Sequence, residues 1–187
     1  MTESPTELLD AAGRGDEAAQ GRLFTLLYDE LRRCAHRQLG GRGETLSTTA
    51  LVHETFVKLV AADTLRLESR RHFMALAARA MRQVLVDHAR RAGADKRGGD
   101  AVFVTLDDRV PDAPPEASEV LALDRALAEL ERIDARAARV VQLHFYGGLR
   151  FISIAELEGL NERTIKRDWQ AARLLLASAI GPAASPG

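Results

Sequence analysis

One segment near the carboxyl end constrains the fold more than any other part of the chain: residues 150–173, which read RFISIAELEGLNERTIKRDWQAAR. Its apolar first part runs into Gly159, a residue that readily adopts the left-handed backbone of a tight turn. Leu160 is placed to fill the gap beside the turn, and Asn161 suits the N-cap of a second helix. Apolar residues then recur with helical spacing at Ile165, Trp169, Ala172 and Leu176. The segment predicts two helices joined by a tight turn.

The polar side of the second helix suits nucleic acid. It carries side chains that can reach phosphates or base edges, namely Arg163, Lys166, Arg167, Gln170 and Arg173. A basic face alone also fits an ordinary amphipathic hairpin turned toward solvent. The turn glycine, the small Ala155 where the helices cross and the polar first turn favour a DNA-binding helix-turn-helix.

The remainder of the chain also has a helical pattern. Aromatic residues make up only 5% of the sequence, and alanine and leucine dominate, which argues against a β-sandwich or barrel. The second expected helix has an apolar stripe at Leu23, Leu26, Leu27, Leu31, Ala35 and Leu39. The sequence therefore predicts an all-α fold. Helices are expected over residues 5–12, 17–39, 69–91 and 133–146, and two further helices are expected to begin at residues 48 and 119. The two helices of the segment at residues 150–173 complete the set.

A break in the helical pattern divides the chain. The segment GADKRGGDAVFVTLDDRVPDAPPEAS is rich in Gly, Pro and Asp and lacks helical periodicity. It predicts a flexible acidic linker between two small helical domains. The expected boundaries are a first domain at 1–97, a linker at 98–118, a second domain at 119–181 and a tail at 182–187.

Charge is segregated along the chain, although the formal net charge is only −1. Residues 66–99 carry nine Lys and Arg against three acidic residues, and residues 100–134 carry ten acidic residues against three Arg. From residue 135 onward there are seven basic and four acidic residues. Because local patches set the field that a phosphate backbone feels, the near-neutral total does not exclude nucleic-acid binding.

Several classes of function lack support in the sequence. The single cysteine, Cys34, excludes an internal disulfide. Its basic neighbours would lower the pKa of the thiol and make it reactive, but its place on a helix favours the role of a small buried residue. His53-Glu54 begins like a zinc-protease helix, but the second histidine would fall at Val57. We therefore expect no catalysis, metal or cofactor. The polar start and the lack of a long apolar run predict a cytoplasmic protein without a membrane span.

Three motifs stand in a fixed order along the chain. LVHETFVKL occupies residues 51–59, FMALAARAMRQVLVDHARR occupies 73–91, and FYGGL is followed by IAELEGLNERTIKRDWQAAR at the carboxyl end. In this order they resemble the second-region signature, the promoter-melting helix and the fourth-region helix-turn-helix of the extracytoplasmic-function (ECF) group of bacterial RNA polymerase sigma factors. The resemblance implies a protein of two helical domains that docks on core polymerase and directs it to promoters, without catalysis of its own.

The resemblance also implies two DNA-binding surfaces. In the second domain, the minus-thirty-five element would be bound in its major groove by Asn161, Glu162, Arg163, Thr164, Lys166, Arg167 and Gln170. In the first domain, a basic track able to hold a strand with splayed bases would bind the minus-ten element through Arg70, Arg71, His72, Arg79, Gln83, Asp87, Arg90 and Arg91.

The helix that begins after Ser47 is implied to dock on the polymerase clamp, through Leu51, His53, Glu54 and Lys58. Core RNA polymerase and promoter DNA are the implied partners, and family members are often also held by an anti-sigma factor. The chain departs from the family at residues 47–50, where Ser-Thr-Thr-Ala replaces commonly acidic positions, and at Gln83, where an asparagine is usual.

Two alternatives remain at the level of sequence. A helix-turn-helix regulator that binds operator DNA without acting as a polymerase subunit would also carry the C-terminal motif, but would not need the basic helix over 69–91. An adaptor whose basic faces meet acidic partner proteins would show no discrimination between bases.

Overall fold

The structure is a computed structural model that describes residues 5–40, 46–61, 69–93, 106 and 115–180. Its described elements are helices, and no strand occurs among these residues, which confirms the all-α prediction. The elements are α1 (Pro5–Gly13), α2 (Glu17–Leu39), α3 (Thr48–Ala61), α4 (Arg70–Gly93), α5 (Ala117–Ile133), α6 (Ala135–Val141), the π-helical turn η1 (Gln142–Tyr146), α7 (Phe151–Glu158) and α8 (Glu162–Ile180). None of the helices in these ranges is long and apolar enough to span a membrane.

Short polar residues and glycines set the ends of the helices. The Asp16 carboxylate accepts a hydrogen bond from the Ala19 N–H at 3.0 Å and starts α2, while Gly40 ends it with a φ of 61°. The Asp134 carboxylate starts α6 in the same way, because it accepts a hydrogen bond from the Ala137 N–H at 3.0 Å. These local contacts satisfy backbone groups that a helix end leaves unpaired.

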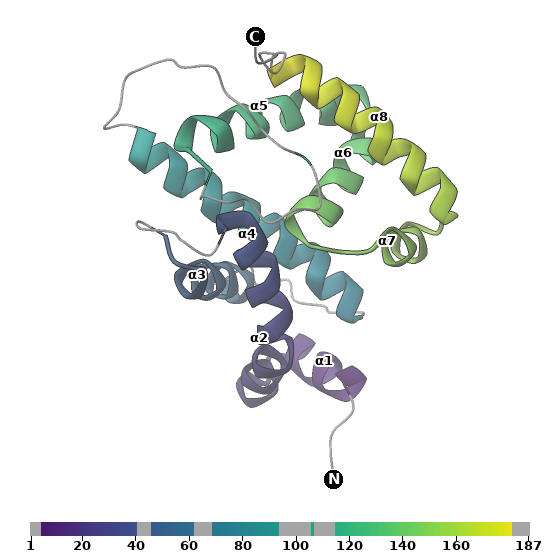
Figure 1. Cartoon of the computed structure of the whole chain (residues 1–187). Coiled ribbons are helices and arrows are strands. Elements are labelled where there is room, and N and C mark those ends of the chain that lie inside the picture. The colour runs from purple at the N-terminus through teal and green to yellow at the C-terminus, as the bar shows by residue number, and fades with distance from the viewer. Residues whose placement is uncertain (1–4, 41–45, 62–68, 94–105, 107–114, 181–187) are drawn as a thin grey trace.

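The helices pack around α4, which runs through the middle of the molecule (Figure 1). On one side α4 contacts α3, and α3 in turn contacts α2; on the other side α4 contacts α5 and η1. The helices α1 and α8 lie at opposite ends (Figure 1). Buried apolar residues from α1 through α8 form one continuous core cluster, so that the N-terminal helices (α1–α4) and the C-terminal helices (α5–α8) share a core.

The expected helix over residues 133–146 is divided in the structure. Ile133 is the last residue of α5 and is 74% exposed, and Asp134 separates it from α6. After Val141 the chain changes to a π-helical turn, which buries Leu143 and Tyr146 in the same core. The predicted helix thus exists as a shorter α-helix with a wider last turn.

Two apolar residues lie where the sequence did not predict them. Leu26 was expected in the buried stripe of α2, but it is 50% exposed. Leu106 was expected in the linker, yet its side chain is buried in the core cluster.

Most of the expected linker lies outside the described residues. The helix α5 begins at Ala117, within the range predicted for the linker. A capping box between Glu116 and Glu119 starts this helix.

Candidate nucleic-acid interface

The turn between α7 and α8 is built from the glycine and the asparagine that mark it in the sequence. Gly159 ends α7 with a φ of 66°, and the Leu160 N–H donates to the Ala155 carbonyl at 2.9 Å. The Asn161 side-chain oxygen accepts from the Thr164 N–H at 2.8 Å and from the Thr164 hydroxyl at 3.0 Å. Leu160 is 36% exposed and lies at the surface, so its expected role as a plug between the helices is wrong.

A buried stripe fixes the rotation of α8. Ile165, Trp169, Ala172 and Leu176 are all buried, as their spacing predicted. The Trp169 ring packs edge-on against His144 with 4.6 Å between centroids, and lies 6.0 Å from Phe151 of α7. Trp169 is therefore a packing residue that orients the helix.

The opposite side of α8 presents its polar residues to solvent. The side chains of Lys166 and Arg167 are 56% and 72% exposed, and Arg163 and Gln170 are exposed as well. Glu162 forms an ion pair with Lys166 at 2.7 Å, one turn along the helix. Arg163, Lys166, Arg167 and Gln170 of the predicted minus-thirty-five set thus share one exposed helical face. Glu162 and Thr164 are only partly exposed, and the side chains of Asn161 and Thr164 are engaged with each other.

An ion pair that the sequence analysis missed holds α8 against α6. The Arg136 guanidinium donates to both carboxylate oxygens of Asp168, at 2.6 and 3.2 Å. The Asp168 side chain is only 6% exposed, and its hydrogen bond and charge raise the pKa of Arg136. Asp168 lies three residues after Ile165, within the buried stripe, and this position was the available signal that its carboxylate needs a partner.

The predicted minus-ten residues divide into two groups on α4. His72, Arg79, Gln83, Asp87 and Arg90 line a groove of about 640 Å³. The others lie outside it: Arg70 forms an ion pair with Glu30, Arg71 forms one with Glu156 of α7, and Arg91 is exposed.

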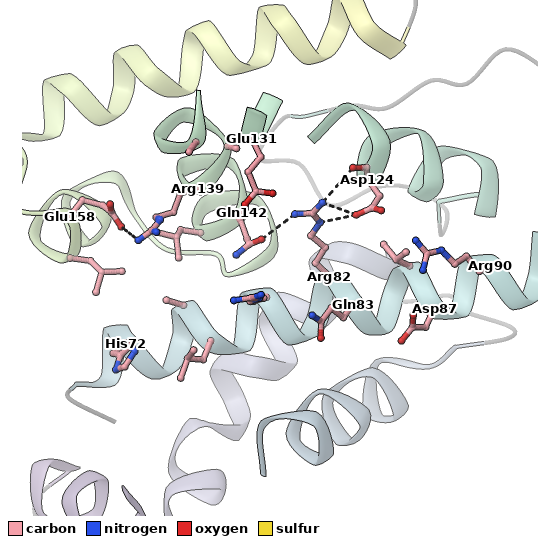
Figure 2. A pocket seen from close by; sticks show the side chains of 18 residues that line it. His72, Arg82, Gln83, Asp87, Arg90, Asp124, Glu131, Arg139, Gln142 and Glu158 are labelled. Carbon is pink, nitrogen blue, oxygen red and sulfur yellow. Dashed lines mark hydrogen bonds and ion pairs between the residues drawn. The ribbon is translucent and has the colours of Figure 1, made fainter. Parts of the chain in front are cut away.

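The far wall of this groove belongs to the C-terminal helices (Figure 2). It presents Asp124 and Glu131 from α5, Arg139 and Gln142 from α6 and η1, and Glu158 from α7. Arg82 of α4 reaches across to Asp124 and Gln142, as Figure 2 shows. The role of Arg82 was not predictable from the sequence, because its partners are remote in the chain.

The predicted docking residues of α3 do not share one environment. His53 and Glu54 are exposed, and the Lys58 ammonium pairs with the Asp87 carboxylate at 3.0 Å. Leu51 is fully buried, so it supports α3 from within and offers no surface to a partner. Next to His53, the half-buried rings of Phe24 and Phe56 lie 4.1 Å apart and form an aromatic patch that the sequence analysis did not identify.

Cys34 has the structural role that its helical position favoured. The thiol is buried and donates to the Gly147 carbonyl oxygen at 3.2 Å. Burial raises its pKa, and this effect outweighs the lowering by Arg37 and Arg33. Within the described ranges, no group of three His, Cys, Asp or Glu side chains is arranged to hold a metal ion.

Comparison with known proteins places this arrangement in a family. No curated protein matches the chain by sequence. The profile of one protein family, described as ECF sigma factor, matches residues 2–180 and so covers both the α4 groove and the helix-turn-helix. The chain therefore belongs to the ECF sigma factor family.

Proposed function

We propose that the protein docks on core RNA polymerase and directs it to specific promoters. The family match over residues 2–180 supports the role of a polymerase sigma factor. The observation that carries the promoter-specific part is the exposed polar face of α8, held rigidly by a capped first turn and a buried stripe that contains Trp169. The protein would act in the cytoplasm, together with the polymerase.

In this proposal α8 enters the major groove of the minus-thirty-five element. Arg163 and Lys166 lie in its first turns and are exposed, where they can reach base edges or phosphates. The exposed Gln170 extends the same face by one turn. An ordered helix supports specificity, because its backbone is already fixed and loses little further freedom on binding.

The minus-ten element is assigned to the basic side of α4. Arg79, Gln83 and Arg90 follow one another along one side of the helix and line the same groove. Arginine can hold the phosphates of a single strand, and Gln83 can read a base edge. The N-terminal helices would form the domain at residues 1–97 and the C-terminal helices the domain at 119–181.

The exposed side of α3 is assigned to the polymerase clamp. His53 and Glu54 are the accessible members of the predicted set, and the Phe24–Phe56 pair beside them adds apolar surface. Aromatic residues beside a charged rim are typical of protein interfaces. An anti-sigma factor is a further proposed partner.

The test is a pull-down of bacterial core RNA polymerase with the purified full chain, followed by transcription from a genomic fragment library. We expect core binding and new, discrete start sites. Glu54→Arg should weaken core binding, and the double variant Arg163→Ala/Lys166→Ala should keep core binding but lose promoter-specific transcripts. The matched control is Arg125→Ala/Arg132→Ala, which removes two exposed cations from α5.

Two results would contradict the proposal. Absence of core binding together with retention of specific duplex DNA would indicate an operator-binding regulator instead. Unchanged promoter-specific transcription in the α8 double variant would show that α8 is not the recognition helix, since both side chains lie on its exposed face.

A further inference from the structure

The short helix α6 supplies one arginine to each helix of the helix-turn-helix. We propose that Arg136 and Arg139 are positioning residues, which fix the angle between α7 and α8 and so direct the exposed face of α8 toward the major groove. Neither arginine belongs to the predicted DNA-binding set. The inference deepens the proposed function, and its DNA readout rests on that function.

The turn between α7 and α8 does not fix this angle by its own packing. Leu160 is 36% exposed, and the Cβ position of Gly159 faces open space among the described residues. Beyond the turn, the two helices meet through apolar contacts such as that between the rings of Trp169 and Phe151, whose centroids lie 6.0 Å apart. Because apolar burial is non-directional, such contacts hold the helices together but permit changes in their angle. A single angle therefore requires a directional contact outside the turn.

Arg136 makes such a contact with α8. Its Nε donates to the Asp168 Oδ2 at 2.6 Å, and its Nη2 donates to the Oδ1 at 3.2 Å. Two hydrogen bonds from one planar guanidinium restrict rotation as well as distance. The Asp168 side chain is only 6% exposed, so the loss of Arg136 would leave a buried carboxylate without its main partner.

Arg139 makes the corresponding contact with α7. Its Nη1 donates to the Glu158 Oε1 at 3.4 Å, and Figure 2 shows this pair. Glu158 is the last residue of α7, directly before the turn glycine, and its side chain is 17% exposed. Because the Arg139 side chain is 63% exposed and the pair is longer, we expect it to contribute less than the Arg136 pair.

The helix α6 is a fixed base for both arginines. They lie three residues apart and therefore project from the same side of the helix. The Asp134 carboxylate caps the first turn of α6, and the helix buries Ala137, Val140 and Val141 in the core cluster. The two arginines thus start from an anchored backbone and connect it to both sides of the turn.

The Arg136 pair also keeps a cation on the DNA-binding face available. Arg167 Nη2 lies 3.8 Å from the same Asp168 carboxylate, farther away than Arg136, and the Arg167 side chain is 72% exposed. Opposite charges attract at such a distance, so without Arg136 the carboxylate would draw Arg167 away from the face assigned to the minus-thirty-five element. Arg136 therefore supports the direction of α8 and the charge that α8 presents.

The experiment separates orientation from stability by comparing two variants. Arg136→Ala removes the contact, whereas Arg136→Leu/Asp168→Leu replaces both charges by apolar groups, which can restore stability without a directional pair. The matched control is Arg132→Ala, which removes an exposed arginine that pairs with Glu129 of its own helix, α5. Urea titration measures the stability of each variant.

Two readouts follow orientation and its consequence. The first is the distribution of distances between nitroxide labels at Ile152→Cys on α7 and Ala177→Cys on α8, both exposed positions, with singly labelled chains as a check on Cys34. The second uses the full chain bound to core polymerase. It is the ratio of transcripts from a promoter found in the genomic library to transcripts from the same promoter with its minus-thirty-five element scrambled.

We expect a narrow distance distribution and a high transcript ratio for the wild-type chain and for Arg132→Ala. Both Arg136 variants should broaden the distribution and lower the ratio about tenfold, which is the discrimination that one base contact provides. Arg139→Ala should lower the ratio less. The double leucine variant keeps the test decisive if Arg136→Ala fails to fold.

One result would overturn the positioning role. If the double leucine variant recovers the wild-type stability together with the wild-type distance distribution and transcript ratio, Arg136 serves stability alone. A wild-type chain that does not prefer the intact promoter would instead overturn the proposed function, and the label distances would still test the positioning role without DNA.

Discussion

At the scale of single residues, Asn161 belongs to the architecture of the helix-turn-helix more than to its contact surface. Its side-chain oxygen accepts two hydrogen bonds from Thr164 and thereby caps α8. We expect Asn161→Ala to lower the free energy of unfolding by about 1 kcal/mol, because the first turn of α8 loses its cap. Asn161→Asp should remain near the wild-type value in urea titrations. Equal losses in both variants would show that the cap is not what stabilises the turn.

The hydroxyl of Tyr146 is buried at the meeting point of the two groups of helices. It has no hydrogen-bond partner among the described residues, and burial raises the pKa of the phenol above its usual range. Removing an unsatisfied buried group should help the folded state, so we expect Tyr146→Phe to leave the free energy of unfolding unchanged or to raise it by up to about 1 kcal/mol. Urea titration at neutral pH measures this, and a clear loss of stability would reveal a partner for the hydroxyl.

The raised pKa of Tyr146 also has a consequence at alkaline pH. Below the usual tyrosine pKa of about 10 both states hold the proton, so the group does not affect stability there. Above about pH 10 the unfolded chain loses the proton while the folded chain keeps it, and the free energy of unfolding should fall by up to about 1.4 kcal/mol per pH unit. We expect Tyr146→Phe to lack this part of the loss and to retain the part due to Cys34, whose pKa is also raised. Parallel stability curves for the two proteins between about pH 9 and 11 would contradict this.

Residue roles were predictable from sequence where the deciding contact is local. The Asn161 cap was predicted from the glycine turn before it, and the burial of Trp169 was predicted from the helical spacing of the apolar residues. The ion pairs Arg82–Asp124 and Arg136–Asp168 join residues 42 and 32 positions apart, and nothing in the local pattern selects these partners. The buried Leu51 was misassigned as a docking residue because a motif match gives no side-chain exposure.

At the scale of elements, helical periodicity predicted where the helices are but not how each one ends. The expected helix at 133–146 is broken because the Asp134 carboxylate caps a new helix, and a π-helical turn then widens the backbone so that Leu143 and Tyr146 reach the core. Leu26 fits the apolar spacing of α2 but lies beyond the width of its buried stripe. The π-helical turn and the exposure of Leu26 depend on the neighbouring elements, which the local sequence does not contain, whereas the Asp134 cap is a local contact that helical periodicity does not reveal.

Two glycines in helical surroundings should respond in opposite directions to alanine. Gly147→Ala would place a Cβ 2.7 Å from the Leu143 carbonyl oxygen and 2.9 Å from the Ala78 Cβ, so we expect a loss of about 1–3 kcal/mol from overpacking. Gly21 lies within α2 with open space at its Cβ position, and Gly21→Ala should raise the free energy of unfolding by about 0.5–1 kcal/mol. Urea titrations of both variants measure the two effects. A neutral Gly147→Ala would show that α4 and η1 are not in close contact in solution.

At the scale of the whole molecule, the sequence predicted two helical domains but not their packing. A segment rich in Gly and Pro permits compact and extended arrangements alike, and it carries no signal for either. The contacts that join the two groups of helices come from single residues on separate helices, such as Gln38 on α2 and Arg82 on α4. Each is unremarkable in its own helix, and only the folded chain brings them to one interface.

A shared core implies that the two groups of helices unfold together. Trp169 is the single tryptophan and lies in α8, so its fluorescence follows the C-terminal helices alone, while far-ultraviolet circular dichroism follows all the helices. We expect the two signals to give one coincident urea transition in the wild-type chain, as a cooperative two-state unit requires. Asp124→Arg should separate them, because losing the Arg82 pair removes a contact between the groups but none within either. The control Glu129→Arg should keep the single transition, because the ion pair of Glu129 lies within α5. Separate transitions in the wild-type chain would show that the contacts at α4 contribute too little to couple the unfolding of the two groups of helices.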